Sequence, residues 1–125
     1  NGVVYIAPGG KHMRVVKKGT DYCIKLSDEP AIDGLRPCAN VMYESLENCQ
    51  YDEITCVVLT GMGADGTKGI QGLAAHHKKL HVIAQDADTC VVYGMPKAIA
   101  QTGLVDEVVP LGSVAETITK NVGVS

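Results

Sequence analysis

A glycine-rich loop in the middle of the chain carries a single acidic residue. The loop covers residues 60–66, follows the apolar run 54–59, and precedes a helix predicted from Thr67. Binding and catalytic loops of α/β proteins lie at such junctions, where the carboxyl end of a strand leads into a helix. Asp65 is the only charged side chain in the loop, so its role decides what chemistry the loop supports.

The loop fits the spacing of a dinucleotide-binding fingerprint. Gly61-x-Gly63-x-x-Gly66 matches the pattern, and Asp86 lies where a ribose-binding acid would follow. The charge argues against this interpretation, because Asp65 would place a carboxylate beside a pyrophosphate held at a helix N-terminus. The pattern alone is therefore weak evidence for a nucleotide.

In the alternative interpretation, the negative charge of Asp65 has a function of its own. A carboxylate at the start of the helix predicted from Thr67 is stabilised as an anion by the helix dipole. An ionised, rigidly held carboxylate can orient a catalytic histidine. It can equally be a simple helix cap, and the residues alone leave both roles open.

The composition indicates one compact domain or a piece of one, with 46% apolar residues among 125. A net charge of −3, the absence of Trp and Phe, and only five Tyr argue against nucleic-acid binding. Five cysteines without a CxxC pair are typical of a reducing compartment. We find no candidate membrane span or signal segment and expect a soluble, cytoplasmic protein without membrane insertion.

Alternating strand and helix patterns predict a three-layer, doubly wound fold with a mostly parallel sheet and a peripheral antiparallel hairpin. The hairpin is expected over 12–16 and 22–26, followed by an irregular segment over 27–37. Strands are predicted at 3–7, 54–60, 80–84 and 104–109, and helices at 40–50, 67–77, 94–102 and 112–120. Because a strand pattern already occupies 3–7, the chain is expected to begin within a fold.

Four segments, taken in order, resemble the bacterial chemotaxis protein-glutamate methylesterases of the CheB type. They are residues 4–12 (VYIAPGGKH), 36–37 (RP), 58–66 (VLTGMGADG), and 84–85 (AQ) with 90–96 (CVVYGMP). Such a resemblance implies a serine hydrolase acting in chemotaxis adaptation. The family cleaves γ-glutamyl methyl esters on chemoreceptors and often deamidates receptor glutamines.

The resemblance also implies roles for individual residues. Asp65 corresponds to the aspartate of the catalytic triad. Met62 corresponds to an oxyanion-hole residue acting through its backbone N–H, although simple packing is an equal alternative. Gly61, Gly63 and Asp86 are weaker candidates for the substrate groove, and turn formation is the default role of Asp86. The implied partners are methylated helices of chemoreceptors and an N-terminal receiver domain, as in a response regulator, without cofactor or metal.

The chain departs from the family pattern at the nucleophile and the base. In the family, a glycine-flanked serine and a Gln-His pair precede the Ala-Pro-Gly-Gly segment, with which this chain begins. None of the serines of this chain lies in such an elbow: Ser27, Ser45, Ser113, Ser125. We therefore expect residues 1–125 to be the C-terminal portion of a methylesterase catalytic domain, inactive alone. A nucleotide-binding or noncatalytic receptor-docking module using the 61–66 loop is the alternative.

The histidines offer no replacement for the base. His12 belongs to the family's own segment and is expected to have a structural role. His76, His77 and His81 lie together near a helix C-terminus, but no Cys or carboxylate completes a metal-ligand spacing. At the start of the helix predicted over 40–50, the residues at 38 and 40 are Cys and Asn, where relatives are expected to carry Ser and Asp.

Overall fold

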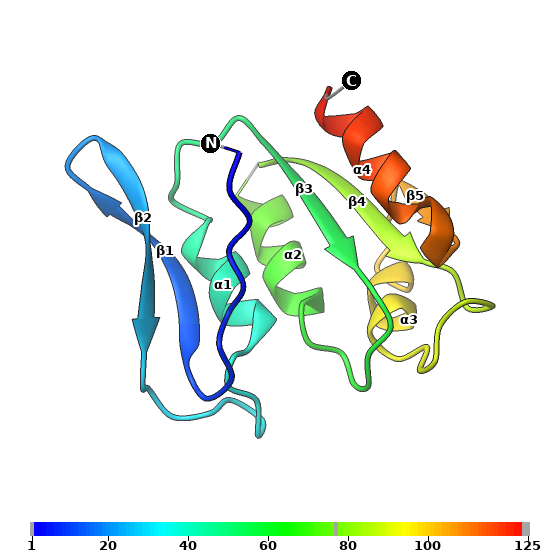
Figure 1. Cartoon of the computed structure of the whole chain (residues 1–125), viewed down its shortest axis with the longest axis horizontal. Helices are drawn as coiled ribbons and strands as arrows, with labels where there is room; N and C mark the ends of the chain where they lie inside the picture. The colour runs from blue at the N-terminus through cyan, green and yellow to red at the C-terminus, as the bar shows by residue number, and fades with distance from the viewer. Residues whose placement is uncertain (1, 77, 124–125) are drawn as a thin grey trace.

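The computed structural model describes residues 2–76 and 78–123 and has the predicted α/β class, with a parallel sheet and an antiparallel hairpin (Figure 1). The elements in chain order are β1 (His12–Lys18), β2 (Asp21–Ser27), α1 (Ala39–Ser45), β3 (Glu53–Val58), α2 (Thr67–Ala75), β4 (Lys79–Gln85), α3 (Met95–Ala100), β5 (Glu107–Val109), the 3-10 turn η1 (Leu111–Ser113) and α4 (Val114–Val122). Within the described ranges, no helix combines the length and the apolar character that crossing a bilayer requires.

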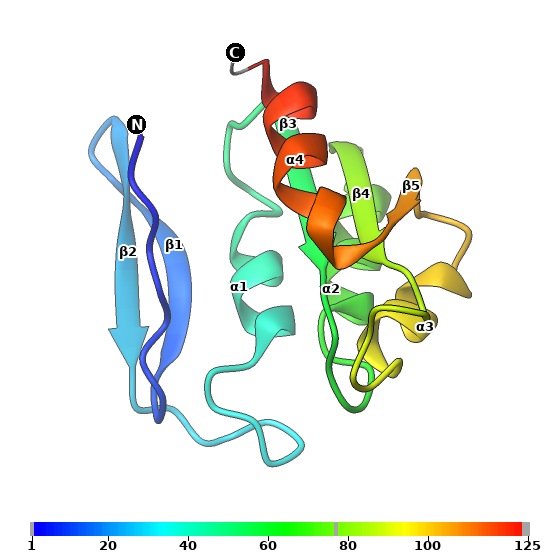
Figure 2. The same cartoon turned by 45° about the vertical axis from the view of Figure 1, so that its right-hand side comes forward.

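The parallel sheet has the strand order β3-β4-β5. The predicted strand-helix-strand unit is confirmed as β3-α2-β4, with Val58 paired to Ala84 at its carboxyl end. Helices α2 and α3 cover one face and α4 the other (Figures 1 and 2). On the α4 side, the Asn121 side-chain amide donates to the Thr55 hydroxyl of β3 at 2.6 Å. Helices on both faces give the three layers that the alternation predicted.

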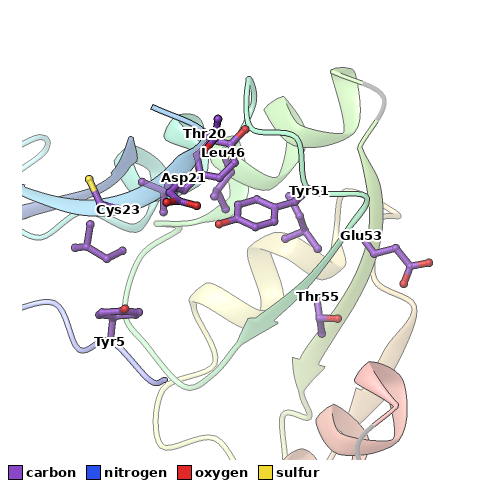
Figure 3. A pocket seen from close by; sticks show the side chains of 12 residues that line it. Tyr5, Thr20, Asp21, Cys23, Leu46, Tyr51, Glu53 and Thr55 are labelled. Carbon is purple, nitrogen blue, oxygen red and sulfur yellow. The ribbon is translucent and has the colours of Figure 1, made fainter. Parts of the chain in front are cut away.

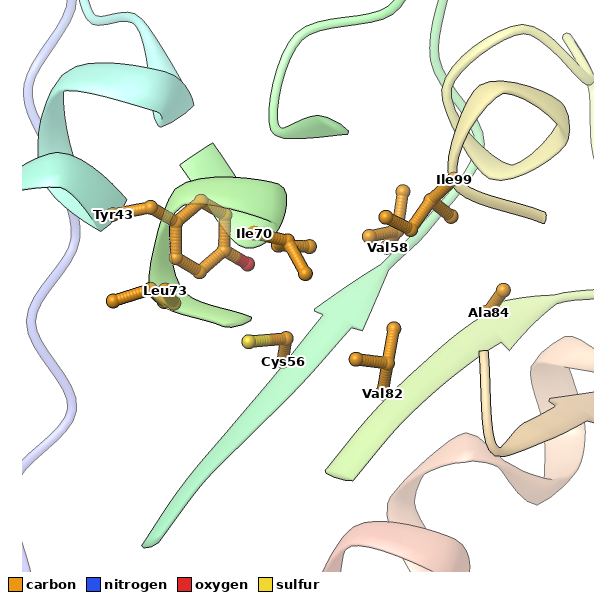
Figure 4. Packing of buried hydrophobic residues seen from close by; sticks show 8 residues of the cluster. All are labelled: Tyr43, Cys56, Val58, Ile70, Leu73, Val82, Ala84 and Ile99. Atoms are coloured by element: carbon orange, nitrogen blue, oxygen red, sulfur yellow. The ribbon is translucent and has the colours of Figure 1, made fainter. Parts of the chain in front are cut away.

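The hydrophobic core lies between the sheet and the first three helices. Ile70 and Leu73 of α2 are fully buried. They belong to a cluster of buried side chains drawn from α1, α2, α3, β3 and β4 (Figure 4): Tyr43, Cys56, Val58, Ile70, Leu73, Val82, Ala84 and Ile99. Since β3 and β4 each contribute alternate residues, the period of two along the strands sets the buried face.

The hairpin lies at one side of the molecule and reaches the rest mainly through α1 (Figure 2). The backbone N–H of Val15 in β1 donates to the Ser45 hydroxyl of α1 at 2.9 Å. A pocket of about 850 Å³ lies between the hairpin and β3 (Figure 3). Tyr5, Tyr51 and Thr55 are among its lining residues, and the outer edge of β3 has no partner strand among the described residues.

Residues 3–7 do not form the predicted strand. The side chains of Val4 and Ile6 are 87% and 86% exposed, and no strand is assigned there. A β pattern becomes a strand only when a partner supplies the ladder of hydrogen bonds. The strand prediction for this apolar run was therefore wrong, and the run is unpaired in the described structure.

Several predicted elements are shorter than expected, among them α3, which covers Met95–Ala100 instead of 94–102, and β3, which ends at Val58 instead of 60. Helix α1 ends at Ser45 because the chain continues in tighter turns, with Leu46 N–H bonded to the Tyr43 carbonyl. Those turns keep a helix-like spacing, which explains the overlong prediction to residue 50. Strand β5 begins at Glu107 instead of 104, and α2 ends at Ala75. His77, the predicted end of α2, lies outside the described residues.

We predict that Leu73→Ala lowers the free energy of unfolding by about 2–5 kcal/mol, because the substitution leaves a cavity in a fully buried site. Gln71→Ala on the exposed side of the same helix is the matched control, with an expected change within about 0.5 kcal/mol. Urea unfolding followed by circular dichroism measures both. Equal effects of the two substitutions would contradict the assignment of the buried face.

Candidate functional site

The loop after β3 is fixed first by a buried amide. The Gln85 side chain is almost fully buried at the end of β4, and its Oε1 accepts the Thr60 N–H at 2.8 Å. Its Nε2 donates to the Thr89 carbonyl at 2.8 Å. One side chain therefore joins the start of the glycine loop to the loop that follows β4. Sequence reasoning did not assign Gln85 this role, although a polar residue ending an apolar strand was a usable signal.

A backbone contact fixes the next part of the loop. The N–H groups of Gly94 and Met95, at the start of α3, donate to the Gly61 carbonyl at 3.1 and 2.8 Å. A Cβ placed on Gly94 would lie 2.7 Å from that carbonyl oxygen and 2.9 Å from the Gly63 nitrogen. Glycine at position 94 thus permits two backbone segments to touch, which residue type alone did not reveal.

Asp65 does not cap the helix that follows it. Its Oδ2 accepts the Ala39 N–H at 2.7 Å, and its Oδ1 accepts the Asn40 N–H at 3.0 Å. These amides begin α1, so the prediction that Asp65 stabilises the start of α2 was wrong about the helix. The physical reason is that α1 approaches from the side of the loop and presents unpaired amide donors to the carboxylate.

The start of α2 is capped in return by Asn40. Its Oδ1 accepts the N–H groups of Gly66 and Gly69 at 3.0 and 2.8 Å. Two helix N-termini therefore face each other, each capped by a side chain from the opposite segment. Sequence reasoning noted Asn40 only as a departure from relatives, although Asn at a helix start is a recognised capping signal.

This exchange argues against the dinucleotide interpretation. A pyrophosphate would need the amides at the start of α2, but those of Gly66 and Gly69 already bond to Asn40. The Asp65 carboxylate lies beside them. The nucleotide-binding alternative is therefore not supported.

Cys38 supplies a third donor to Asp65. Its thiol is buried and lies 3.2 Å from Oδ1. Burial, and next the hydrogen bond to Asp65, raise the pKa of the Cys38 thiol. A raised pKa keeps the thiol protonated and therefore able to donate.

The carboxylate retains room for one further partner. A carboxylate has about four acceptor positions, two on each oxygen. Oδ1 receives Cys38 and Asn40, and Oδ2 receives Ala39, which leaves one position on Oδ2. Asp65 is also one of the residues that line a groove of about 580 Å³.

The other predicted loop residues divide into two groups. Met62 and Gly63 line the groove with Asp65, whereas Gly61 and Asp86 do not. The Met62 side chain is 85% exposed, so it is not packing in a core. Its backbone N–H has no hydrogen-bond partner within residues 2–76 and 78–123 and is free to act as a donor. The roles proposed for Met62, Gly61 and Gly63 stay predictions.

Asp86 holds a turn in its own loop. Its Oδ1 accepts both the backbone N–H and the hydroxyl of Thr89, at 3.0 and 2.6 Å. This is the turn-forming role that sequence reasoning gave as the default. The groove assignment of Asp86 receives no support from its position.

The described histidines lie away from Asp65, whose side-chain partners are those at the start of α1. His12 is buried and hydrogen-bonded through Nε2 to the Pro30 carbonyl at 2.9 Å, as a structural role requires. His76 Nδ1 contacts the Gly72 carbonyl at 2.8 Å, and His81 Nε2 contacts Glu107 at 2.6 Å. In the part of the chain that the structure describes, no cluster of metal-ligating side chains is found.

We predict that Gly94→Ala destabilises the fold by about 1–3 kcal/mol, because the new methyl group overlaps backbone atoms of residues 61 and 63. Gly112→Ala, where the same methyl group meets nothing within 4 Å, is the matched control. Thermal unfolding distinguishes them. An unchanged midpoint for Gly94→Ala would show that the loop is not held by this contact.

Comparison with known proteins identifies the family of the chain. The model of the CheB methylesterase family matches residues 1–118. The chain is 44% identical over 123 residues to a protein-glutamate methylesterase/protein-glutamine glutaminase of Desulfotalea psychrophila, covering 97% of this chain and 33% of that relative. The protein-glutamate methylesterase/protein-glutamine glutaminase 2 of Pseudomonas aeruginosa is 38% identical to this chain. The match covers 94% of this chain and 33% of that relative.

A solved structure shows the same fold. The CheB methylesterase catalytic domain of Thermotoga maritima superposes with a TM-score of 0.84 at 33% identity, covering 93% of this chain and 60% of that chain. The chain spans about a third of the length of the curated relatives it matches. It belongs to the CheB methylesterase family.

Proposed function

We propose that this chain is the C-terminal portion of the catalytic domain of a chemotaxis protein-glutamate methylesterase, in which Asp65 orients the histidine of a Ser-His-Asp triad. The observation that carries the proposal is the Asp65 carboxylate itself. Three donors from the start of α1 hold it, one acceptor position on Oδ2 remains, and it lines a groove. An orienting carboxylate needs this combination of rigidity and one open acceptor.

The serine and the histidine are proposed to lie elsewhere in the whole protein, in the region that corresponds to the part of the relatives outside this match. Each described histidine has a hydrogen-bond partner elsewhere, and the chain covers 60% of the solved catalytic domain. The unpaired outer edge of β3 and the pocket beside it (Figure 3) offer a place where further strands of the same domain can pair. The exposed apolar residues 3–6 support the same view.

The proposed chemistry is acyl transfer from a glutamyl side chain. The serine hydroxyl attacks the γ-carbonyl carbon of the ester while the histidine accepts its proton and later returns it to the departing methanol. Water then hydrolyses the acyl-enzyme to free enzyme and a glutamate carboxylate. Asp65 holds the imidazole tautomer and stabilises the imidazolium in both steps. The free N–H of Met62 is the proposed oxyanion donor.

The same site would release ammonia from a glutamine amide, in line with the second activity in the relatives' names. The proposed substrates are methylated helices of chemoreceptors, and a receiver domain is the proposed N-terminal partner in the whole protein. A cytoplasmic location of the whole protein is part of the same proposal.

In the whole protein, Asp65→Asn is expected to remain folded with a lower free energy of unfolding, because the new side-chain NH2 group cannot accept one of the donors from the start of α1. It is also expected to lose about four orders of magnitude in turnover, because a neutral amide no longer stabilises the imidazolium. Release of labelled methanol from methylated receptors in membranes measures this. Asp52→Asn, at an exposed position before β3, is the control and should retain activity. A loss below tenfold for Asp65→Asn would make Asp65 a capping residue only.

Residues 1–125 alone are expected to release no methanol above background, since the loss of the serine or the histidine from such a triad costs a factor of about 10⁶. The same assay, run beside the whole protein at equal concentration, tests this. Ester hydrolysis by the isolated chain would require a nucleophile within these residues and would overturn the proposed division of the triad.

A further inference from the structure

Asn40 and Asp65 form a closed pair across the two facing helix starts. We infer that Asn40 is a positioning residue that fixes the Asp65 carboxylate and, being a neutral amide, keeps a single negative charge at this point. The inference rests on the proposed function, because the effect of Asn40 on catalysis passes through Asp65.

Two hydrogen bonds of opposite direction close the pair. The Asn40 N–H donates to Asp65 Oδ1 at 3.0 Å, and the Gly66 N–H donates to Asn40 Oδ1 at 3.0 Å. Because residues 65 and 66 are adjacent, Asn40 of α1 is hydrogen-bonded both to the Asp65 carboxylate and to the backbone next to it. A second bond from the Gly69 N–H, at 2.8 Å, ties the same amide oxygen to the first turn of α2.

The packing of α1 on α2 gives the pair little freedom. A Cβ placed on Gly69 would lie 2.6 Å from the Cβ of Tyr43 and 3.1 Å from the Cα of Asn40. The two helices therefore touch at backbone distance where Asn40 reaches across. Small displacements of a catalytic group can cost two orders of magnitude in rate, so a clamp at this place matters for turnover.

The neutrality of Asn40 has its own consequence. An aspartate at position 40 could accept the same two amide bonds and would be ionised by them. It would add a second negative charge next to Asp65. Because nearby negative charge favours the protonated imidazole, the base would then be active only at higher pH.

The other titratable groups near Asp65 are accounted for. Cys38, just before α1, and Tyr43 in α1 stay protonated, since burial is the largest cause raising the pKa of each. Asp33, from the turn before α1, and Lys68, from α2, line the same groove. These four side chains are the same in an Asn40 variant. A shift of the pH profile relative to the wild-type protein therefore reports on position 40.

The test uses the whole protein with three variants, assayed by methanol release from methylated receptors in membranes between pH 5 and 9. Asn40→Ala is expected to lower kcat by about ten- to a hundredfold with KM nearly unchanged. Asn40→Asp, which keeps both acceptor bonds, is expected to retain kcat at its plateau within about threefold. The acidic limb of its kcat/KM profile should move up by roughly half a pH unit or more.

Asn121→Ala is the matched control, since it removes one side-chain hydrogen bond on the opposite face of the sheet. Its kcat and pH profile should equal those of the wild-type protein. If Asn40→Ala does not fold, Asn40→Asp alone decides, through the position of its acidic limb. An unmoved limb in Asn40→Asp, or an unchanged kcat in a folded Asn40→Ala, overturns the inference.

A wrong proposed function and a wrong role for Asn40 give different results in these assays. If Asp65→Asn keeps full activity, the proposed triad role is wrong. If Asp65→Asn is inactive while both Asn40 variants behave as wild type, the proposed function stands and the role of Asn40 is refuted.

Discussion

The mutual capping of α1 and α2 is the interaction on which the site depends. Each helix begins with amide groups that have no partner within the helix, and leaving them unpaired in a partly buried place is costly. Asp65 satisfies those of α1, and Asn40 satisfies those of α2. The loop between β3 and α2 therefore has one defined shape, set by the needs of two helices.

The same capping contacts stabilise the helix starts and hold the Asp65 carboxylate in place. A carboxylate near a protein interior is costly unless donors compensate it, and the start of α1 provides such donors. With seven residues, α1 is too short to be stable on its own and relies on tertiary contacts. Capping and catalysis, which sequence reasoning treated as alternatives for Asp65, are thus compatible in one side chain.

Sequence patterns predicted the parts of the fold that follow from local periodicity. The strand-helix-strand unit β3-α2-β4 and the hairpin over β1 and β2 were both confirmed. The unpaired segment 3–7 shows the limit of that reasoning, since pairing depends on a second strand that no local pattern reveals.

The sequence indicated which residue types form the site, but it did not indicate which residues contact one another. Asp65 was singled out by its charge and by the family motif, but which helix it caps depends on how α1 packs on α2. Gln85 and Gly94 act through contacts about 25 to 33 positions away in the chain. Such long-range contacts are invisible to spacing rules, which compare residues within one element or loop.

The backbone joint between residues 61 and 94 has a consequence for protein engineering. A loop is often treated as a portable cassette, yet residues 60–66 take their shape from the amides of Gly94 and Met95 and from the buried Gln85. If residues 60–66 alone were grafted onto another strand-helix junction, the aspartate would lack the contacts that orient its side chain. The smallest transplantable unit includes α1 and the segment 85–96.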